Sequence, residues 1–164
     1  MTNEQRSAIA DKITSLYDFD TSVEASTTGA IDVAGRLFEL YTNLSLEITT
    51  VEEEVLFSNG RGVVSRYPLR QVEYVRVNDV DLPVKYTFEY GLVVLNYPYC
   101  GEAFVKYQAG LGNDLPEEIV YALAHLAVFL LRIEAGVIGG GNEVKVDFSQ
   151  LPPIVREVIE RWRG

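Results

Sequence analysis

Residues 119–131 read IVYALAHLAVFLL, and this stretch sets the main constraint on the fold. His125 is its one strongly polar side chain. A helix that is apolar on every face cannot lie on the surface of a small soluble domain. With thirteen residues it is also shorter than the roughly 20 apolar residues that cross a bilayer. The helix therefore needs cover on both sides, from the rest of this chain or from another copy, and this favours assembly over catalysis.

The residues on either side of this stretch fit the two ends of one long helix. Pro116, Glu117 and Glu118 suit a first turn, where a missing donor and negative charge are favourable. Arg132 suits the carboxyl end, because the helix dipole favours a cation there. We therefore expect the apolar helix to open at Leu115-Pro116 and to end at Arg132.

Three further helices are expected near the two ends of the chain. Apolar residues at three- and four-residue spacing predict helices over Asn3–Leu16 and Gly29–Asn43. Residues 151–164 predict a last helix, because two prolines open it and one of its faces is apolar. Residues 136–150 contain a glycine triplet and no periodicity, which predicts a flexible tether before that helix.

Between the second helix and the apolar helix, the pattern changes to that of β-strands. Asn59-Gly60 is a strong hairpin signal, because both residues tolerate positive φ. Another turn is expected over Asn78–Asp81. From Val84 to Tyr90, large apolar residues alternate with polar ones, which predicts a strand with one wet face.

These elements predict an α+β fold in a single domain over 1–164. It comprises an amino-terminal helical pair, a small antiparallel β meander, the long apolar helix and a tethered carboxyl-terminal helix. An alternative at this point is an ordinary monomeric domain whose sheet alone buries the apolar helix. A length of 164 residues suffices for a sizeable core in either case.

The charge of the chain limits its partners. The net charge is −10, of which residues 1–60 carry −8, while residues 61–113 carry +1 and residues 114–164 carry −3. Such a chain lacks the cationic surface that tight nucleic-acid binding requires. Cys100, the single cysteine, excludes an internal disulfide and fits a reducing compartment. The first residues lack the pattern of a signal peptide, and we expect a soluble protein that is intracellular when made.

The sequence contains no strong catalytic or cofactor motif. His125 has no cysteine or aspartate within a helical turn, so we interpret it as a core or interface histidine. Cys100 has no base nearby in sequence, and we expect a buried or spectator thiol. Neither Gly110-Leu111-Gly112 nor the glycine triplet forms a phosphate-binding loop. No enzyme activity, cofactor or metal is therefore expected.

One enzymatic alternative stays open. Glu52, Glu53 and Glu54 could hold a divalent metal in a small metal-dependent hydrolase. Neighbouring residues on a strand point to alternating sides, so we expect a solvated face at these three acids.

The order of the elements resembles the head–tail connector, or head-completion adaptor, proteins of tailed bacteriophages. Tyr67-Pro68-Leu69 and the following Val72–Val75 are similar to a leucine-proline step before a strand. Residues 105–110, VKYQAG, are similar to the family's valine-x-tyrosine-x-alanine-glycine signature. Leu115-Pro116 before an apolar helix, and the closing residues from Leu151 to Arg163, also fit. The resemblance covers roughly residues 30 to 163 and lies in the order of loose motifs.

This resemblance implies a structural protein of the virion neck, made in the host cytoplasm. Members form a ring, usually of twelve copies, beneath the portal protein, where they extend the DNA channel and bind other neck or tail proteins. DNA would pass without tight binding, which the acidic composition fits, and no membrane is involved. Another phage neck or tail-completion protein is the alternative within the same class.

Two contact sites are hypotheses at this stage. The terminal segment has an apolar stripe with Trp162 as the expected hot spot, and we expect it to bind the portal or a neighbouring subunit. The residues assigned to this contact are Ile154, Val155, Val158, Ile159, Trp162 and Arg163. The alternative is that this stripe packs on the chain's own meander. A second contact, with a neighbouring subunit or the next neck protein, is assigned to the hairpin tip at Asn59, Gly60 and Arg61.

Overall fold

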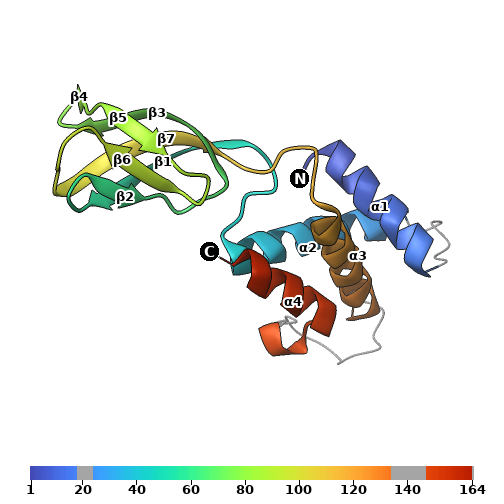
Figure 1. Ribbon diagram of the computed structural model, residues 1–164. Helices are drawn as coiled ribbons and strands as arrows, with labels where there is room; N and C mark the ends of the chain where they lie inside the picture. The colour runs from blue at the N-terminus through green and yellow to red at the C-terminus, as the bar shows by residue number, and fades with distance from the viewer. Residues whose placement is uncertain (18–23, 134–146, 164) are drawn as a thin grey trace. The chain divides into compact units, whose positions relative to one another are not determined.

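The computed structural model describes residues 1–17, 24–133 and 147–163. These residues form two compact units (Figure 1). The helical unit contains Met1–Thr42 and Asn113–Arg163, and the β unit contains Asn43–Gly112. The single domain predicted over 1–164 stays a prediction.

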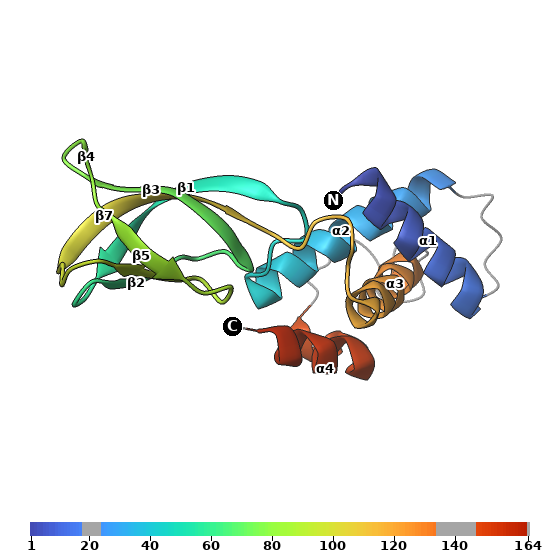
Figure 2. The same ribbon diagram turned by 45° about the horizontal axis from the view of Figure 1, so that its top comes forward.

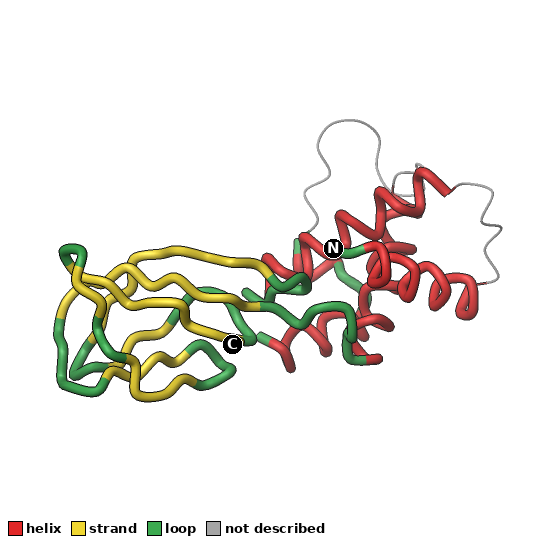
Figure 3. The backbone as a smooth tube through the Cα atoms, turned by 90° about the horizontal axis from the view of Figure 1, so that it is seen from above, coloured by secondary structure: helices red, strands yellow, loops and turns green. Residues whose placement is uncertain are grey.

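The helical unit is built around the apolar helix of the sequence. Its α-helices are α1 (Asn3–Tyr17), α2 (Glu24–Thr42), α3 (Glu117–Arg132) and α4 (Pro153–Trp162), and a 3-10 turn, η3 (Phe148–Gln150), precedes α4. All four predicted helices are therefore present. α1, α2 and α4 each pack against α3, and Figure 3 shows these helices gathered in one bundle.

Helix α3 finds its cover inside this unit. Eight of its side chains are buried: Ile119, Ala122, Leu123, Ala124, Leu126, Ala127, Val128 and Leu130. Burying one large apolar side chain contributes about 1.5–3 kcal/mol, so the large buried side chains of α3 contribute substantially to the stability of the bundle. Its apolar character is explained within one chain and gives no evidence of a neighbouring copy.

The start of α4 differs from the predicted tether. The side chain of Asp147 accepts a hydrogen bond from the backbone N–H of Ser149, and Gln150 completes a reciprocal cap with Asp147. Phe148 packs on Tyr41 of α2, with ring centroids 5.3 Å apart. The last part of the predicted tether, residues 147–150, is therefore an ordered turn. Residues 136–146 of that prediction lie outside the described residues.

The β unit contains two antiparallel sheets. Its strands are β1 (Thr49–Phe57), β2 (Arg61–Val63), β3 (Leu69–Val77), β4 (Val80–Asp81), β5 (Val84–Thr87), β6 (Leu92–Leu95) and β7 (Gly101–Ala109). One sheet has the order β1-β7-β3-β4 and the other the order β2-β6-β5. Figure 2 shows β2 and β5 in a layer beneath β1, β3 and β7. The α+β class is confirmed, and the pairing of β1 with the last strand, β7, is more elaborate than a meander.

One core fills the space between the two sheets. Val55 and Phe57 of β1 and Val105 of β7 meet Val93 and Leu95 of β6 there. The predicted turns are also present: Asn59, Gly60, Asn78 and Asp79 have positive φ, as tight hairpins require. The two sheets therefore form a sandwich with one buried face each.

The alanine-glycine end of the VKYQAG motif has a physical reason. A Cβ on Gly110 would lie 2.0 Å from the carbonyl oxygen of Glu47, so no larger residue fits there. The N–H of Gly110 donates to the carbonyl of Pro68 (2.9 Å), and Arg70 donates to the carbonyl of Gly110. Gly110 thus allows the end of β7 to lie against residues 47 and 48.

Candidate interaction surfaces

His125 packs among aromatic rings of the helical unit. Its Nδ1 hydrogen-bonds the hydroxyl of Tyr17, and its ring lies 4.4 Å from that of Tyr121 between centroids. Burial lowers the pKa of His125 below its usual value. Its Nε2 is buried with no hydrogen-bond partner among the described residues. The position fits a histidine of the bundle core, as the sequence suggested.

The carboxylates of β1 are not gathered into a metal site. Glu53 accepts hydrogen bonds from the hydroxyl of Tyr107 and from the N–H of Ser65, both at 2.7 Å. Burial, together with this bond to Glu53, raises the pKa of Tyr107 to about 12. Glu52 and Glu54 lie on the opposite, exposed side of β1. Within residues 1–17, 24–133 and 147–163, no three His, Cys, Asp or Glu side chains form a group that could hold a metal.

Cys100 is exposed, so of the two expected possibilities, a buried thiol or a spectator thiol, the first does not hold. It lies in the turn before β7, where the backbone N–H of Asn59 points at its Sγ at 3.3 Å. Gly101, which follows directly, has a φ of 145°, a conformation that favours glycine.

The hairpin after β1 differs from the exposed tip that the sequence suggested. Asn59 and Arg61 are exposed, but Gly60 is buried. Its N–H donates to the carbonyl of Tyr99 and its carbonyl accepts from the N–H of Leu95, both at 2.8 Å. Gly60 is therefore held inside the β unit, and a contact of this hairpin with a partner could use Asn59 and Arg61 only.

The terminal helix α4 packs on its own unit. Val155, Val158 and Ile159 are buried, and α4 contacts α3 and α2. These three side chains are thus occupied within the chain, which corrects their assignment to a partner's groove. The alternative placed the stripe on the chain's own meander, and it is the helices that bury it.

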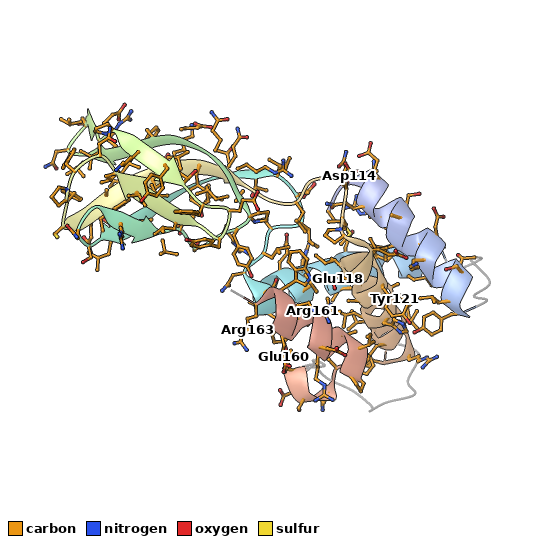
Figure 4. The ribbon with its side chains drawn as sticks, in the orientation of Figure 1. Asp114, Glu118, Tyr121, Glu160, Arg161 and Arg163 are labelled. Carbon is orange, nitrogen blue, oxygen red and sulfur yellow. The ribbon has the colours of Figure 1, made fainter. Side chains whose placement is uncertain are left out.

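Trp162, the expected hot spot, is tied to α3. Its Nε1 donates to one carboxylate oxygen of Glu118 at 2.8 Å, and Arg161 contacts the other oxygen at 2.6 Å. Figure 4 shows Glu118 and Arg161 beside one another, with Arg163 further along the chain. Of the residues predicted to dock, Ile154 and Arg163 are exposed. Ile154 lines a shallow groove with Tyr121 of α3.

The β2-β6-β5 sheet carries apolar side chains on its outer face as well as on its inner one. Val93 and Leu95 of β6 lie in the core between the sheets, whereas Leu92 and Val94 lie on the other face of the strand. Leu92 is half-buried there, and Val94, which pairs with Arg61 and Tyr86, is buried. The sequence signal was the run Leu92–Leu95, LVVL. Four consecutive apolar residues are typical of a strand with two apolar faces. Sequence reasoning counted this run as a strand and missed its outer face.

A bulge in β5 places Tyr86, and Phe88 directly after the strand, on this outer face. Val84 pairs with Leu95, but Tyr86 pairs with Val94, so the register shifts at Lys85. Val84 packs on the core, whereas Tyr86 and Phe88 are 43% and 41% exposed. The expected strand with one dry aromatic face is therefore wrong, because a bulge reverses which side the following residues face.

Neither protein-family models nor curated protein sequences match this chain. Solved structures do match it over its whole length. A chain from the neck of an empty gene transfer agent (GTA) particle, computed with C6 symmetry, gives a TM-score of 0.66 at 14% identity, covering 100% of this chain and 93% of that chain. The neck of a native GTA particle, computed with C12 symmetry, gives 0.65 at 16% identity with the same coverage.

A chain from the virion of a native GTA particle gives a TM-score of 0.65 at 14% identity, covering 100% of this chain and 92% of that chain. The chain shares the fold of a GTA neck component. The expected resemblance to head–tail connector proteins is in agreement with this fold. No helix among the described residues combines the length and apolar character needed to cross a membrane.

Proposed function

We propose that this protein is a structural component of the neck of a phage-like virion, where its copies form a ring beneath the portal. The observation that carries the proposal is the match of the whole chain to chains from GTA necks with sixfold and twelvefold symmetry. Twelve copies is the number that the family resemblance implies. A structural role also suits the acids of β1. Glu53 accepts a hydrogen bond from Tyr107, and Glu52 and Glu54 face the solvent.

The charge of the chain supports a further part of this proposal, the passage of DNA through the ring. A net charge of −10 per copy repels the phosphate backbone where acids face the channel, because binding to DNA requires cations that release its counterions. DNA is thus a passing molecule and is not held tightly. A map of the assembled neck with a basic channel wall along this protein would contradict this part of the proposal.

We also propose that the terminal helix binds the portal, through its exposed residues alone. Because Val155, Val158 and Ile159 are buried in the helical unit, a partner would contact Ile154, Arg163 and the groove beside Tyr121. Asn59 and Arg61 of the hairpin are the second contact, with a neighbouring subunit or the next neck protein. Ile154→Asp with Arg163→Glu should leave the melting temperature unchanged and lower the number of copies per particle, whereas a normal copy number would remove this docking site.

The position in the virion can be tested directly. Particles from a culture that produces this protein are labelled with gold-coupled antibody against the chain and viewed by electron microscopy, and its copies per particle are counted by quantitative mass spectrometry. We expect one labelled vertex and twelve copies. Label over the whole capsid, or its absence from particles, would contradict a neck role. Label at the far end of the tail would favour the alternative, a tail-completion protein.

A further inference from the structure

The two outer faces of the β sandwich differ in chemistry. We define the apolar face, on the β2-β6-β5 sheet, by Arg61, Val63, Tyr86, Phe88 and Leu92. We define the acidic face, on the β1-β7 part of the other sheet, by Glu54, Leu56, Glu102 and Phe104. Because the sheets share one core between them, these two faces lie on opposite sides of the unit (Figure 2).

The apolar face leaves several large hydrophobic side chains exposed. Val63 is 64% exposed and pairs with Leu92, and Phe88 donates its N–H to the carbonyl of Leu92 at 2.9 Å. The ring of Phe88 lies 5.4 Å from that of Tyr86 and 5.2 Å from that of Tyr90. Contiguous exposed aromatic residues are typical of protein interfaces.

The charges on the apolar face are positive. Arg61 pairs with Val94, the same residue that Tyr86 pairs with from the other side. The Nζ of Lys85 lies 5.8 Å from the ring centre of Tyr86. A partner for this face should therefore offer apolar side chains with carboxylates beside them.

The acidic face of the same protein has that composition. Leu56 and Phe104 are 70% and 51% exposed. In the register of β1 and β7, Leu56 lies opposite Glu102, and Phe104 lies opposite Glu54. Each exposed apolar side chain thus has a carboxylate directly across the β1-β7 pair. On the β3 side, Phe104 lies opposite Arg76, whose guanidinium is already paired with Asp81.

We propose that the acidic face of one copy binds the apolar face of the next copy. Leu56 and Phe104 pack on the aromatic and branched side chains, and Glu54 and Glu102 lie opposite Arg61 and Lys85. Complementary charge favours this pairing over two apolar faces, which would bring Arg61 of each copy together. The inference rests on the proposed function, because a ring is what such a contact would build.

The geometry of this contact determines the kind of assembly. The two faces belong to one copy and lie on opposite sides of it, so each copy binds two neighbours through different surfaces. A contact of this kind is heterologous, and it produces a closed ring or an open filament. It cannot stop at a symmetric dimer.

The test uses two purified variants of the full chain. Arg61→Glu with Phe88→Ser disables the apolar face, and Glu54→Lys with Phe104→Ser disables the acidic face. Sedimentation velocity of the wild-type chain should show species larger than dimers as its concentration rises toward 1 mM. Each variant alone should associate at least about tenfold more weakly, a loss of about 1.4 kcal/mol. An equimolar mixture of the two should form one heterodimer and nothing larger, because one working pair of faces remains.

The control is Val80→Ser. Val80 is 63% exposed but lies in the β3–β4 hairpin outside both faces, so its substitution should change nothing. Circular dichroism of each variant confirms that the fold is retained. A wild-type chain that stays monomeric to 1 mM, or a mixture that assembles beyond a dimer, would overturn the proposal. Antibody labelling of particles tests the neck role separately, so each idea can fail without the other.

Discussion

The helical unit and the β unit differ in where they place their apolar residues. The helical unit contains the most hydrophobic stretch of the sequence, and it buries eight side chains of that stretch in its own core. The β unit has a weaker hydrophobic pattern, yet it leaves Val63, Tyr86, Phe88 and Tyr90 between 41% and 64% exposed. A strongly apolar stretch of sequence therefore indicates that its side chains are buried. It does not indicate whether the residues that cover them belong to the same chain or to another molecule.

The difference lies in how each kind of element can be covered. A helix with apolar residues all round can be enclosed by three other helices of one chain, as α3 is by α1, α2 and α4. A sheet in a two-layer sandwich has one layer against it and none on its other side. Apolar residues on that other side can be covered within the chain only by neighbouring side chains of the same face, as Val94 is, and the others stay exposed.

Paired substitutions in the two units give the largest expected difference. Leu123→Ala in α3, where the side chain is fully buried, should lower the free energy of unfolding by about 2–5 kcal/mol. Phe88→Ser, on the apolar face, should change that of the monomer by less than about 1 kcal/mol, as surface substitutions usually do. Urea unfolding followed by circular dichroism measures both. A large loss for Phe88→Ser would mean that this face already has its cover within one chain.

Glycine substitutions sharpen the comparison at the level of the backbone. Gly60→Ala should cost about 1–3 kcal/mol, because φ is +74° and its Cβ would lie 2.5 Å from the carbonyl oxygen of Tyr97. Gly29→Ala in α2 is the matched control: nothing lies within 4 Å of its Cβ, and alanine should stabilise the helix by about 0.5–1 kcal/mol. Thermal melts of both variants should move in opposite directions. Equal shifts would contradict the close packing at Gly60.

The smallest effect expected is a loss of stability at alkaline pH that arises at Tyr107 of the β unit. The pKa of Tyr107 is raised from 10.0 to about 12 in the folded protein, so the folded state holds this proton more tightly than the unfolded state. Its contribution to stability is therefore full below pH 10 and is lost as the pH rises toward 12. Tyr107→Phe should show a shallower loss of stability over that range. Tyrosinate absorbance at alkaline pH should lack its last step in this variant, and an unchanged titration would contradict the assignment.

The sequence predicted the helices well because their signals are local. The amino-terminal helix was expected over Asn3–Leu16 and is Asn3–Tyr17, and the apolar helix ends at Arg132 as expected. The turns at Asn59-Gly60 and Asn78-Asp79 were also predicted, since positive φ limits which residues can occupy them. Each of these features depends on residues within a few positions of each other.

The remaining features depend on residues that are distant in sequence. The pairing of β1 with β7 joins Thr49 to Ala109, and no local pattern indicates it. The terminal helix looked available to a partner because its stripe is apolar, but Glu118 of α3 holds Trp162 and Arg161 against its own unit. The sequence pattern of an apolar stripe is the same whether the helix packs on its own chain or on a partner.

The outer sheet face was missed for a different reason. Period-two alternation from Val84 to Tyr90 assigned all four large residues to one side. The register shift at Lys85 separates Val84 from the other three, and a bulge changes the count of residues without changing their types. The run from Leu92 to Leu95 was the one local hint, because it contains no polar residue for a wet face.

The bulge at Lys85 also bears on which changes to the gene this surface would survive. Replacing Lys85 by another residue leaves the pairing of β5 with β6 as it is, so Tyr86 stays on the outside. Deleting its codon would remove the extra residue, and Val84, Tyr86 and Thr87 would then pair without a break with Leu95, Val94 and Val93. Tyr86 would still face outward, because it would follow Val84 directly and neighbouring residues of a strand point to opposite sides. Among related proteins, chains with and without this bulge should therefore both present an aromatic face, provided that an aromatic residue pairs with the position of Val94.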